Sequence, residues 1–208
     1  LQYPRRHSPD VLLPMPAYPR LLNAFRQYEK WLTRLGIDSV GALNDAIVAG
    51  RAKEVILVSE ALHEQQISEI AEEIVKRADQ ARIVLIAGPS SSGKTTFSKR
   101  LAVQLLAQGI SPFALEMDNY FVDRDATPLG EDGNPDYEAL SALNTTVLQD
   151  HLQRLLAGEE VQLPHFNFKT GKSEPGEVMT LARGQLIILE GIHGLNPDLL
   201  GGISPEQT

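Results

Sequence analysis

The sequence predicts an α/β fold of three layers (α/β/α), with a mainly parallel sheet and a helical N-terminal appendage. Residues 88–96 read Gly-Pro-Ser-Ser-Ser-Gly-Lys-Thr-Thr and fit the phosphate-binding pattern G-x-x-x-x-G-K-[ST] at every fixed position. The apolar, β-branched run at residues 83–87 is typical of a buried parallel strand. Apolar residues at helical spacing follow the loop, and Gly109 is placed to end that helix. This order of strand, loop and helix predicts a P-loop NTPase.

Composition limits what the chain can be. Of its 208 residues, 42% are hydrophobic and 22% are charged, as in an ordinary globular protein. The absence of cysteine excludes disulfides and any thiolate nucleophile or metal ligand. The sequence contains neither a signal peptide nor an apolar run long enough for a membrane span, so we expect no membrane partner and a cytoplasmic location. The net charge of −8 argues against a general nucleic-acid-binding surface.

The chain is predicted to divide into a helical appendage or linker at residues 1–80 and a P-loop domain at residues 81–208. Five prolines among residues 1–19 favour an extended or disordered segment there. The chain begins without Met and shows no final strands of the predicted sheet. We therefore expect a piece of a longer protein, truncated at its C-terminus.

Three helices are predicted within the appendage. An apolar stripe predicts a helix over residues 20–35, and a second helix over 39–47 is capped by its serine. Residues 51–58 are ambiguous, and Ser59 is placed to cap a third helix. His63, in the first turn of that helix, is expected to be a surface or packing residue.

The glycine-rich loop predicts nucleotide chemistry. Its candidate nucleotide ligands are Gly88, Pro89, Ser90, Ser91, Ser92, Gly93, Lys94, Thr95 and Thr96. The two glycines permit backbone angles and a close approach that a side chain would obstruct, so the loop amides can form a nest for an anion. Lys94 can reach the outer phosphates of ATP, and Thr95 can offer its hydroxyl to Mg²⁺. The alternative is an ordinary Gly- and Ser-rich turn.

Two carboxylates follow predicted strands. Residues 111–117 form the second predicted strand, and Asp118 comes directly after it, where an open α/β sheet faces its ligand. Asp118 can take a proton from a hydroxyl nucleophile or hold Mg²⁺ through water, and a turn cap is the alternative. Residues 186–189 form another buried parallel strand. Glu190 after it fits the Walker B pattern, an acid next to the magnesium.

Polar and helical segments lie between these strands. Residues 122–135 are predicted to form a long polar loop, and Asp136 to open a short helix. Asn144 or Thr145 is placed to cap the next helix, which ends at Gly158.

A β-hairpin is predicted from the alternation in residues 161–172, with a return strand that contains residues 178–181. Phe166 and Phe168 on this hairpin can line a pocket for a flat ring. The alternative is that both pack in the core.

Together these residues resemble the uridine kinase and phosphoribulokinase group of P-loop kinases, over about residues 82–200. The matching stretches are residues 88–96, 118–121, 132–138, 164–168 and 190–195. Within the group, the chain is most similar to long bacterial nucleoside-kinase-like proteins, in which a region related to threonyl-tRNA synthetase precedes the kinase. Residues 1–80 resemble the tail of that leading region.

The resemblance implies roles for matching residues. Asp118 matches the acid that activates the sugar hydroxyl, and Tyr120 in the same stretch is an expected substrate contact. Asp136, or Asp132 in another alignment, falls where ribose hydroxyls are held. Phe166 falls where an aromatic ring lies against the base. The implied cofactors are ATP and Mg²⁺, and the implied partners are a small-molecule substrate and, as an option, a second copy of the chain.

The chain also departs from the family pattern. Uridine kinases carry a His soon after the base-contacting aromatic, and Gly171 stands there in the simplest alignment. The family supplies arginines from a lid after the Walker B strand, whereas no Arg follows Arg183. We therefore expect this chain to bind nucleotide but to turn over slowly.

The predicted function is transfer of the γ-phosphoryl group of ATP to a hydroxyl of a small acceptor, with a nucleoside as the expected acceptor. Lys94 and Asp118 are the predicted catalytic residues. One alternative is a kinase for another small acceptor, such as a sugar phosphate. Another is a regulatory or RNA-associated module that binds nucleotide and has little kinase activity.

Overall fold

The computed structural model describes residues 19–208, so most of the predicted extended or disordered segment lies outside the described residues. The chain divides into two compact units, Leu1–Leu62 and His63–Thr208. The division falls inside one long helix, α3, which spans Ala52–Arg77.

The first unit contains α1 (Pro19–Leu35), α2 (Val40–Val48) and the first half of α3. Ser39 caps α2 as predicted, because its hydroxyl oxygen accepts a hydrogen bond of 3.1 Å from the amide of Ala42. The apolar faces meet in a small core of Ile37, Ala46 and Val55, with Leu32, Leu35 and Leu43 packed around it.

The prediction that the third helix begins at Ser59 is wrong, because α3 already begins at Ala52. Arg51 and Glu54 form an ion pair of 2.8 Å around its first turn. The hydroxyl of Ser59 donates a hydrogen bond of 2.7 Å to the carbonyl of Val55, inside the helix. A serine hydroxyl that is satisfied in this way has no need to cap a new helix.

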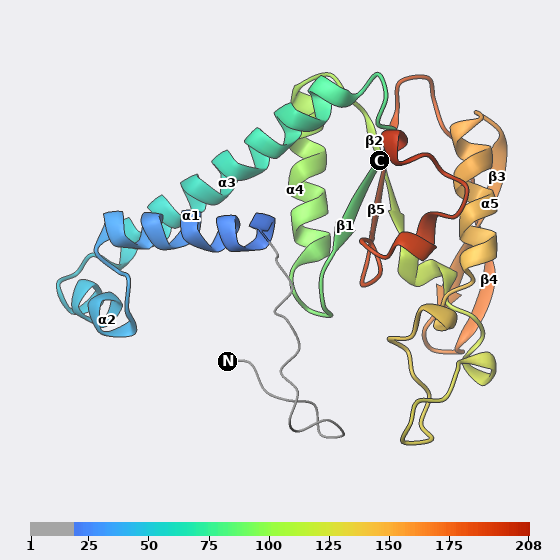
Figure 1. Ribbon diagram of the computed structural model, residues 1–208, viewed down its shortest axis with the longest axis horizontal. Coiled ribbons are helices and arrows are strands. Elements are labelled where there is room, and N and C mark those ends of the chain that lie inside the picture. Colours follow the sequence, from blue (N-terminus) through green and yellow to red (C-terminus); the bar gives the residue numbers. More distant parts are fainter. Residues whose placement is uncertain (1–18) are drawn as a thin grey trace. The chain divides into compact units, whose positions relative to one another are not determined.

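The second unit is built on a parallel sheet of three strands in the order β1-β5-β2 (Figure 1). These strands span Ile83–Ala87, Leu186–Gly191 and Pro112–Glu116, respectively. The central strand, β5, is buried along its whole length. Its Ile188 pairs with Val84 on one side and with Ala114 on the other.

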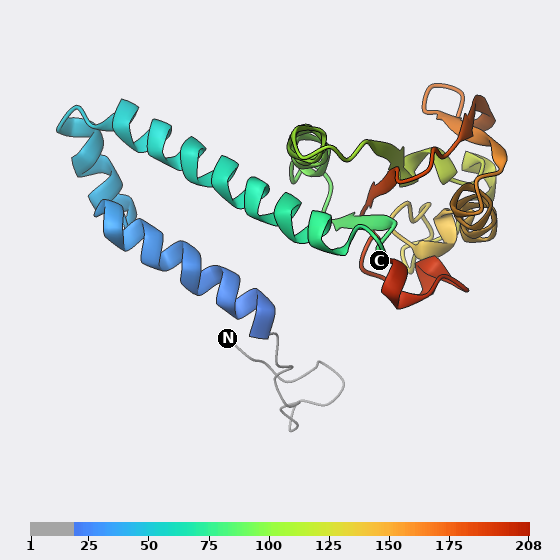
Figure 2. The same ribbon diagram turned by 90° about the horizontal axis from the view of Figure 1, so that it is seen from above.

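Helices cover both faces of this sheet, as the predicted three layers require (Figure 2). Alternate residues of β1 and β5 point to opposite faces. Ile86 and Ile188 pack against the second half of α3 and against α4 (Lys94–Ala107). Ile187 and Leu189 pack on the other side, in a core that includes Leu148, Leu152 and Leu155 of α5 (Thr145–Leu156).

A separate antiparallel hairpin pairs β3 (Glu160–Asn167) with β4 (Lys172–Thr180), as predicted. Asn144 rather than Thr145 caps α5, since its side-chain oxygen accepts from the amide of Val147 at 3.2 Å. Asp136 does not open a helix. The first helical turn after the polar loop is a short 3₁₀ segment, η3 (Leu140–Ala142).

The second half of α3 belongs to the second unit because Ile67 and Ala71 are fully buried against α4 and the sheet. The boundary between compact units therefore lies about one half-helix before the domain boundary predicted at residues 80 and 81. That domain boundary stays a prediction.

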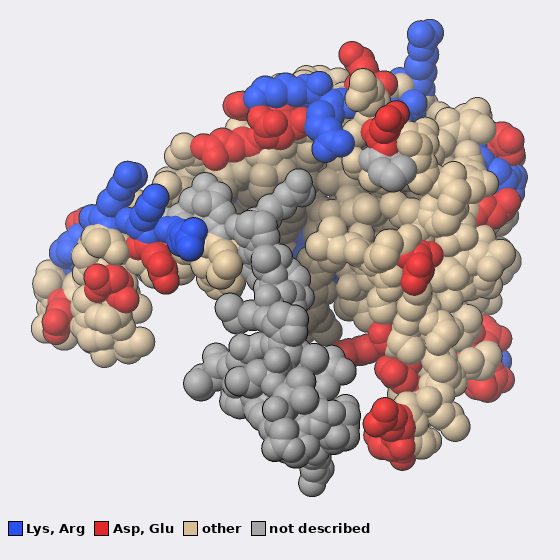
Figure 3. All heavy atoms as spheres, viewed as in Figure 1, with Lys and Arg blue, Asp and Glu red and all other residues tan. Residues whose placement is uncertain are grey.

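The surface carries charged side chains of both signs (Figure 3). Acidic and basic side chains are interspersed on the face shown in Figure 3. Within residues 19–208, no helix combines the length and the apolar character that crossing a membrane requires.

Candidate functional site

The glycine-rich loop connects the end of β1 to the N-terminal end of α4. Gly93 precedes α4 with a φ of 87°, and Ser91 also has a positive φ, of 57°. A Cβ on Gly88 would lie 2.8 Å from the Ser92 hydroxyl oxygen and 3.3 Å from Cγ of Lys94. Glycine is therefore required for the loop to close tightly around the space in which a phosphate would be held.

Lys94 lies at the first position of α4 and is half-buried. Its Nζ donates a hydrogen bond of 2.9 Å to the carbonyl of Pro89. The ammonium group thus folds back over the loop, where an anion would compete for it with a neutral carbonyl. A charged acceptor forms the stronger hydrogen bond of the two.

Thr95 and Glu190 are brought together from α4 and the end of β5. The Thr95 hydroxyl donates to Oε1 of Glu190 at 2.6 Å. Glu190 is 9% exposed, and its Oε2 is buried without a hydrogen-bond partner in the described part of the chain. A buried carboxylate oxygen that lacks a partner is costly unless a cation or water satisfies it.

These two residues therefore fit a magnesium site. Mg²⁺ prefers oxygen ligands and commonly takes only one or two from the protein, with water and phosphate oxygens completing the set. Within residues 19–208, no group of three or more His, Asp or Glu side chains is arranged as a metal centre.

Asp118 follows β2 within a short 3₁₀ segment, η1 (Met117–Tyr120). The pKa of its carboxyl is raised, chiefly because the surrounding protein withdraws water from it. The Lys94 ammonium opposes this shift, and the negative charge of Glu190 adds to it. Asp118 therefore lies within electrostatic reach of both, and the ends of β1, β2 and β5 bring the three side chains to one edge of the sheet.

Tyr120 is placed elsewhere. It is 1% exposed, and its ring packs in the core beneath the sheet. Its hydroxyl lies 3.2 Å from Nδ1 of His151 on α5, and burial raises its pKa. The burial of Tyr120 favours a packing role. The substrate contact that the sequence assigns to it stays a prediction.

Phe166 belongs to a cluster of three aromatic rings. Its centroid lies 5.6 Å from that of Phe121 and 5.1 Å from that of Phe168, in edge-to-face arrangements. Phe166 is 4% exposed, whereas Phe168 is 59% exposed. The amide of Phe166 also donates to the side-chain oxygen of Asn119, next to Asp118, at 3.2 Å. The ring open to a ligand is therefore Phe168.

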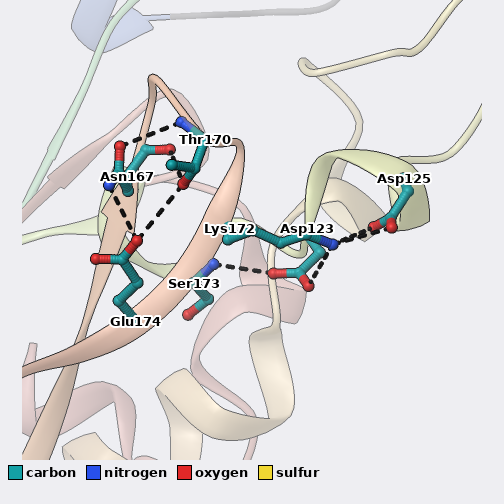
Figure 4. A network of polar contacts seen from close by, with 7 residues as sticks. All are labelled: Asp123, Asp125, Asn167, Thr170, Lys172, Ser173 and Glu174. Atoms are coloured by element: carbon teal, nitrogen blue, oxygen red, sulfur yellow. Dashed lines mark hydrogen bonds and ion pairs between the residues drawn. The ribbon is translucent and has the colours of Figure 1, made fainter.

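The hairpin is fastened to the segment after Asp118 by a network that we call the hairpin latch (Figure 4). Lys172 pairs with Asp123 at 3.1 Å and with Asp125 at 2.9 Å. Asp123 also accepts a hydrogen bond of 2.9 Å from the amide of Ser173. These bonds lower the pKa of the Asp123 carboxyl, the backbone bond being the larger cause. No local sequence pattern indicates the latch, because its partners are about 50 positions apart along the chain.

Arg124 adds a second fastening beside the latch. Its amide donates to the carbonyl of Gly171 at 2.8 Å, and its Nη2 donates to the carbonyl of Phe168 at 2.7 Å. Gly171 has a φ of 70°, and a Cβ there would lie 2.8 Å from Cβ of Arg124. A histidine in place of Gly171 would be strained and would displace the arginine.

The acidic loop residues cap local turns. Asp136 Oδ1 accepts from the amides of Glu138 and Ala139 at 2.9 and 3.1 Å. Both carboxylate oxygens of Asp132 accept from Asn134, and these bonds lower the pKa of Asp132. Their assignment to ribose hydroxyls stays a prediction.

A cavity of about 480 Å³ opens beside the phosphate loop. It is lined by Ser92, Gly93 and Lys94 of the loop, by Thr96 and Phe97 of α4, by Ile86 and Ala87 of β1, and by His63 of α3. The sequence predicts a surface or packing role for His63. A single His in a helix is too common to indicate a site.

The second unit is similar in sequence to several known proteins. Residues 83–198, more than half of the chain, match the model of the phosphoribulokinase / uridine kinase family. A uridine kinase from Deinococcus deserti is 31% identical over 113 residues, which cover 54% of this chain and 53% of that protein. A uridine kinase from Bacillus mycoides is 34% identical over 110 residues, or 53% of this chain and 50% of the relative. The chain thus spans about half the length of the curated relatives it matches.

A solved structure from Silicibacter sp. TM1040, assigned as a fructose transport system kinase, shares the fold. It superimposes with a TM-score of 0.50 at 21% identity, and covers 64% of this chain and 67% of that one. The matched region, residues 83–198, contains the phosphate loop, Asp118, the hairpin and Glu190. The N-terminal region related to threonyl-tRNA synthetase finds no support in these comparisons and stays a prediction. On the family match and the shared fold, the chain belongs to the phosphoribulokinase / uridine kinase family.

Proposed function

We propose that the chain carries the phosphate-binding and acceptor-activating residues of an ATP-dependent kinase that phosphorylates a hydroxyl of a small acceptor, a nucleoside. The observation that carries the proposal is the convergence of Lys94, Asp118 and Glu190 at one edge of the sheet. A cation, a base and a metal-binding acid are the groups that phosphoryl transfer requires.

In the proposed reaction, the acceptor hydroxyl attacks the γ-phosphorus of ATP, its proton passes to the Asp118 carboxylate, and ADP leaves. The pKa of the Asp118 carboxyl is raised, which makes its carboxylate a stronger base and favours general-base catalysis. Lys94, released from the Pro89 carbonyl, stabilises charge on the transferring group. Mg²⁺ held by Thr95 and Glu190 would neutralise phosphate charge when bound.

A nucleoside acceptor is supported by the aromatic cluster at the hairpin. Phe168 offers an exposed ring, and the buried ring of Phe166 packs edge-to-face against it. A flat base can stack on such a ring, and stacking tolerates different bases. The uridine kinases among the relatives point to the same class of acceptor.

A sugar phosphate is the second candidate, and Arg124 favours it. Its guanidinium lies against the hairpin turn, where the side chain is exposed to solvent. Arginine binds phosphate well because its planar fork can donate two parallel hydrogen bonds. An anionic acceptor would therefore find a cation near the aromatic cluster.

The test measures ADP formation with ATP and Mg²⁺ against a panel of ribonucleosides and sugar monophosphates. We expect turnover to depend on a nucleoside and to disappear in Lys94→Ala. Turnover with sugar phosphates alone, lost in Arg124→Gln, would select the second candidate. ATP hydrolysis that ignores every acceptor would instead indicate the regulatory module and contradict the kinase proposal.

A further inference from the structure

His63 lies outside residues 83–198, the part of the chain that matches the family, yet it lines the cavity beside the phosphate loop. The lining of the cavity combines two kinds of residue. The loop residues Gly93 and Lys94 suit phosphate oxygens. Ile86, Ala87 and Phe97 are apolar and suit the base and ribose of a nucleotide whose phosphates occupy the loop.

The hydrogen bonds of His63 fix which of its ring nitrogens can donate. Arg100 Nη1 lies 3.1 Å from His63 Nδ1. A guanidinium has only donors, so Nδ1 must accept, and the proton of the neutral ring must lie on Nε2. His63 therefore presents an N–H donor from the far side of its ring.

The backbone that carries His63 is also held in place. Glu64 accepts hydrogen bonds from Nε of Arg100 at 3.0 Å and from Nε2 of Gln104 at 2.6 Å. One turn later, Ile67 is fully buried against α4 and the sheet. This part of α3 is thus fixed on α4, which also begins at Lys94. The ring of His63 is held at a defined place relative to the phosphate loop.

We propose that His63 is a nucleotide ligand: its Nε2–H donates a hydrogen bond to the nucleoside part of a nucleotide whose phosphates lie in the loop. This inference rests on the proposed function, because it assumes that the loop holds a nucleotide. It assigns to α3, a helix of the N-terminal region, a direct part in nucleotide recognition.

Two substitutions separate this role from a purely structural one. His63→Asn keeps an oxygen near the place of Nδ1, which can still accept from Arg100, but it removes the donor at the far side. His63→Gln keeps a donor near the place of Nε2 and loses the Arg100 contact. Gln66→Ala, at an exposed position one turn away on the same helix, is the matched control.

The measurement is isothermal titration of the 208-residue chain with ADP and, separately, with tripolyphosphate, both in Mg²⁺. Tripolyphosphate fills the loop but has no nucleoside. For His63→Asn we expect ADP to bind about 2- to 10-fold more weakly, the usual effect of one hydrogen bond, with tripolyphosphate unchanged. His63→Gln should bind ADP nearly as well as the natural chain.

Other results would overturn the inference. Unchanged ADP affinity in His63→Asn, with ADP binding intact in the natural chain, would remove His63 from the site and leave the proposed function standing. Equal weakening of ADP and tripolyphosphate would show that the substitution disturbs the loop itself. Failure of the natural chain to bind ADP at all would instead reject both the proposed function and this inference.

Discussion

Lys94 bonds a carbonyl of its own loop, so a cation intended for phosphate is already positioned before any ligand arrives. We predict that Lys94→Ala lowers kcat by about 10²–10³, or about 3–4 kcal/mol, as when one donor to a developing negative charge is removed. Lys99→Ala, an exposed lysine of the same helix, should leave kcat unchanged. Circular dichroism of both variants checks that the fold is intact, and normal turnover in Lys94→Ala would contradict the proposed site.

Removing the Asp118 carboxylate should lower activity but raise stability. Because its folded pKa is raised, its charge destabilises the fold above that pKa, and the penalty fades as the pH falls towards the unfolded value. We predict that Asp118→Asn raises Tm at pH 7 and that the gain shrinks as the pH is lowered towards about 4, near the ordinary pKa of an Asp carboxyl. Its kcat should fall by about 10²–10⁴, the usual contribution of a general base.

Two results would contradict this assignment of Asp118. An equal or lower Tm for the variant at pH 7 would show that the surroundings of Asp118 do not destabilise its charged form. Weakened binding of ATP and Mg²⁺ at unchanged kcat would make Asp118 a metal-binding residue instead.

Residue types and spacing are enough to predict that Thr95 and Glu190 meet, because the strand before the phosphate loop, β1, and the Walker B strand, β5, are parallel neighbours in the sheet. They are not enough to predict which aromatic side chain stays exposed. Phe166 and Phe168 stand two positions apart in the sequence, and both rings contact Phe121, yet Phe166 is 4% exposed and Phe168 is 59% exposed. This difference depends on tertiary packing, which the local sequence pattern does not contain.

The hairpin is an element whose position depends on the latch. Lys172 and its two aspartates are all substantially exposed, so we expect Lys172→Met to change stability little. We predict instead a fall in kcat/KM for the acceptor, by up to about 10²-fold, because a misplaced contact surface costs binding geometry. Affinity for ATP, which binds at the loop, should not change.

Lys169→Met is the matched control for the latch. Lys169 lies in the same turn and forms no ion pair among the described side chains. Equal losses in both variants would mean that positive charge on the hairpin matters and that the latch does not.

Element boundaries were predictable where a cap or a glycine marks them, as at Ser39 and Asn144. The start of α3 is not predictable, because charged residues at positions 51, 53 and 54 precede a continuous apolar run at 55–58, and the segment shows no clear helical period. Their helical state is set by packing of Val55 into the small N-terminal core and by an ion pair at the first turn. Such long-range packing overrides local signals.

At the scale of the whole molecule, α3 contributes to two compact units, and its second half is part of the second core. We predict that Ile67→Ala, at a fully buried position, lowers the free energy of unfolding by about 2–5 kcal/mol. Ile70→Ala is the control, since Ile70 is 41% exposed, and should cost about 0.5 kcal/mol or less. Chemical denaturation followed by circular dichroism measures both, and equal losses would show that α3 packs on the sheet less closely than described.

The strand order β1-β5-β2 also determines at which stage of folding the site can form. Val84 of β1 must find Ile188 of β5, about one hundred residues away, and such distant pairings slow folding. The phosphate loop can form early from neighbouring residues, whereas Glu190 arrives only with the central strand. We predict that, on refolding, ADP binding in Mg²⁺ recovers together with the last far-UV circular dichroism phase. Trp31 fluorescence, which reports on the first unit, can recover sooner. Binding that returned well before the sheet signal would show that the loop alone suffices to hold the nucleotide.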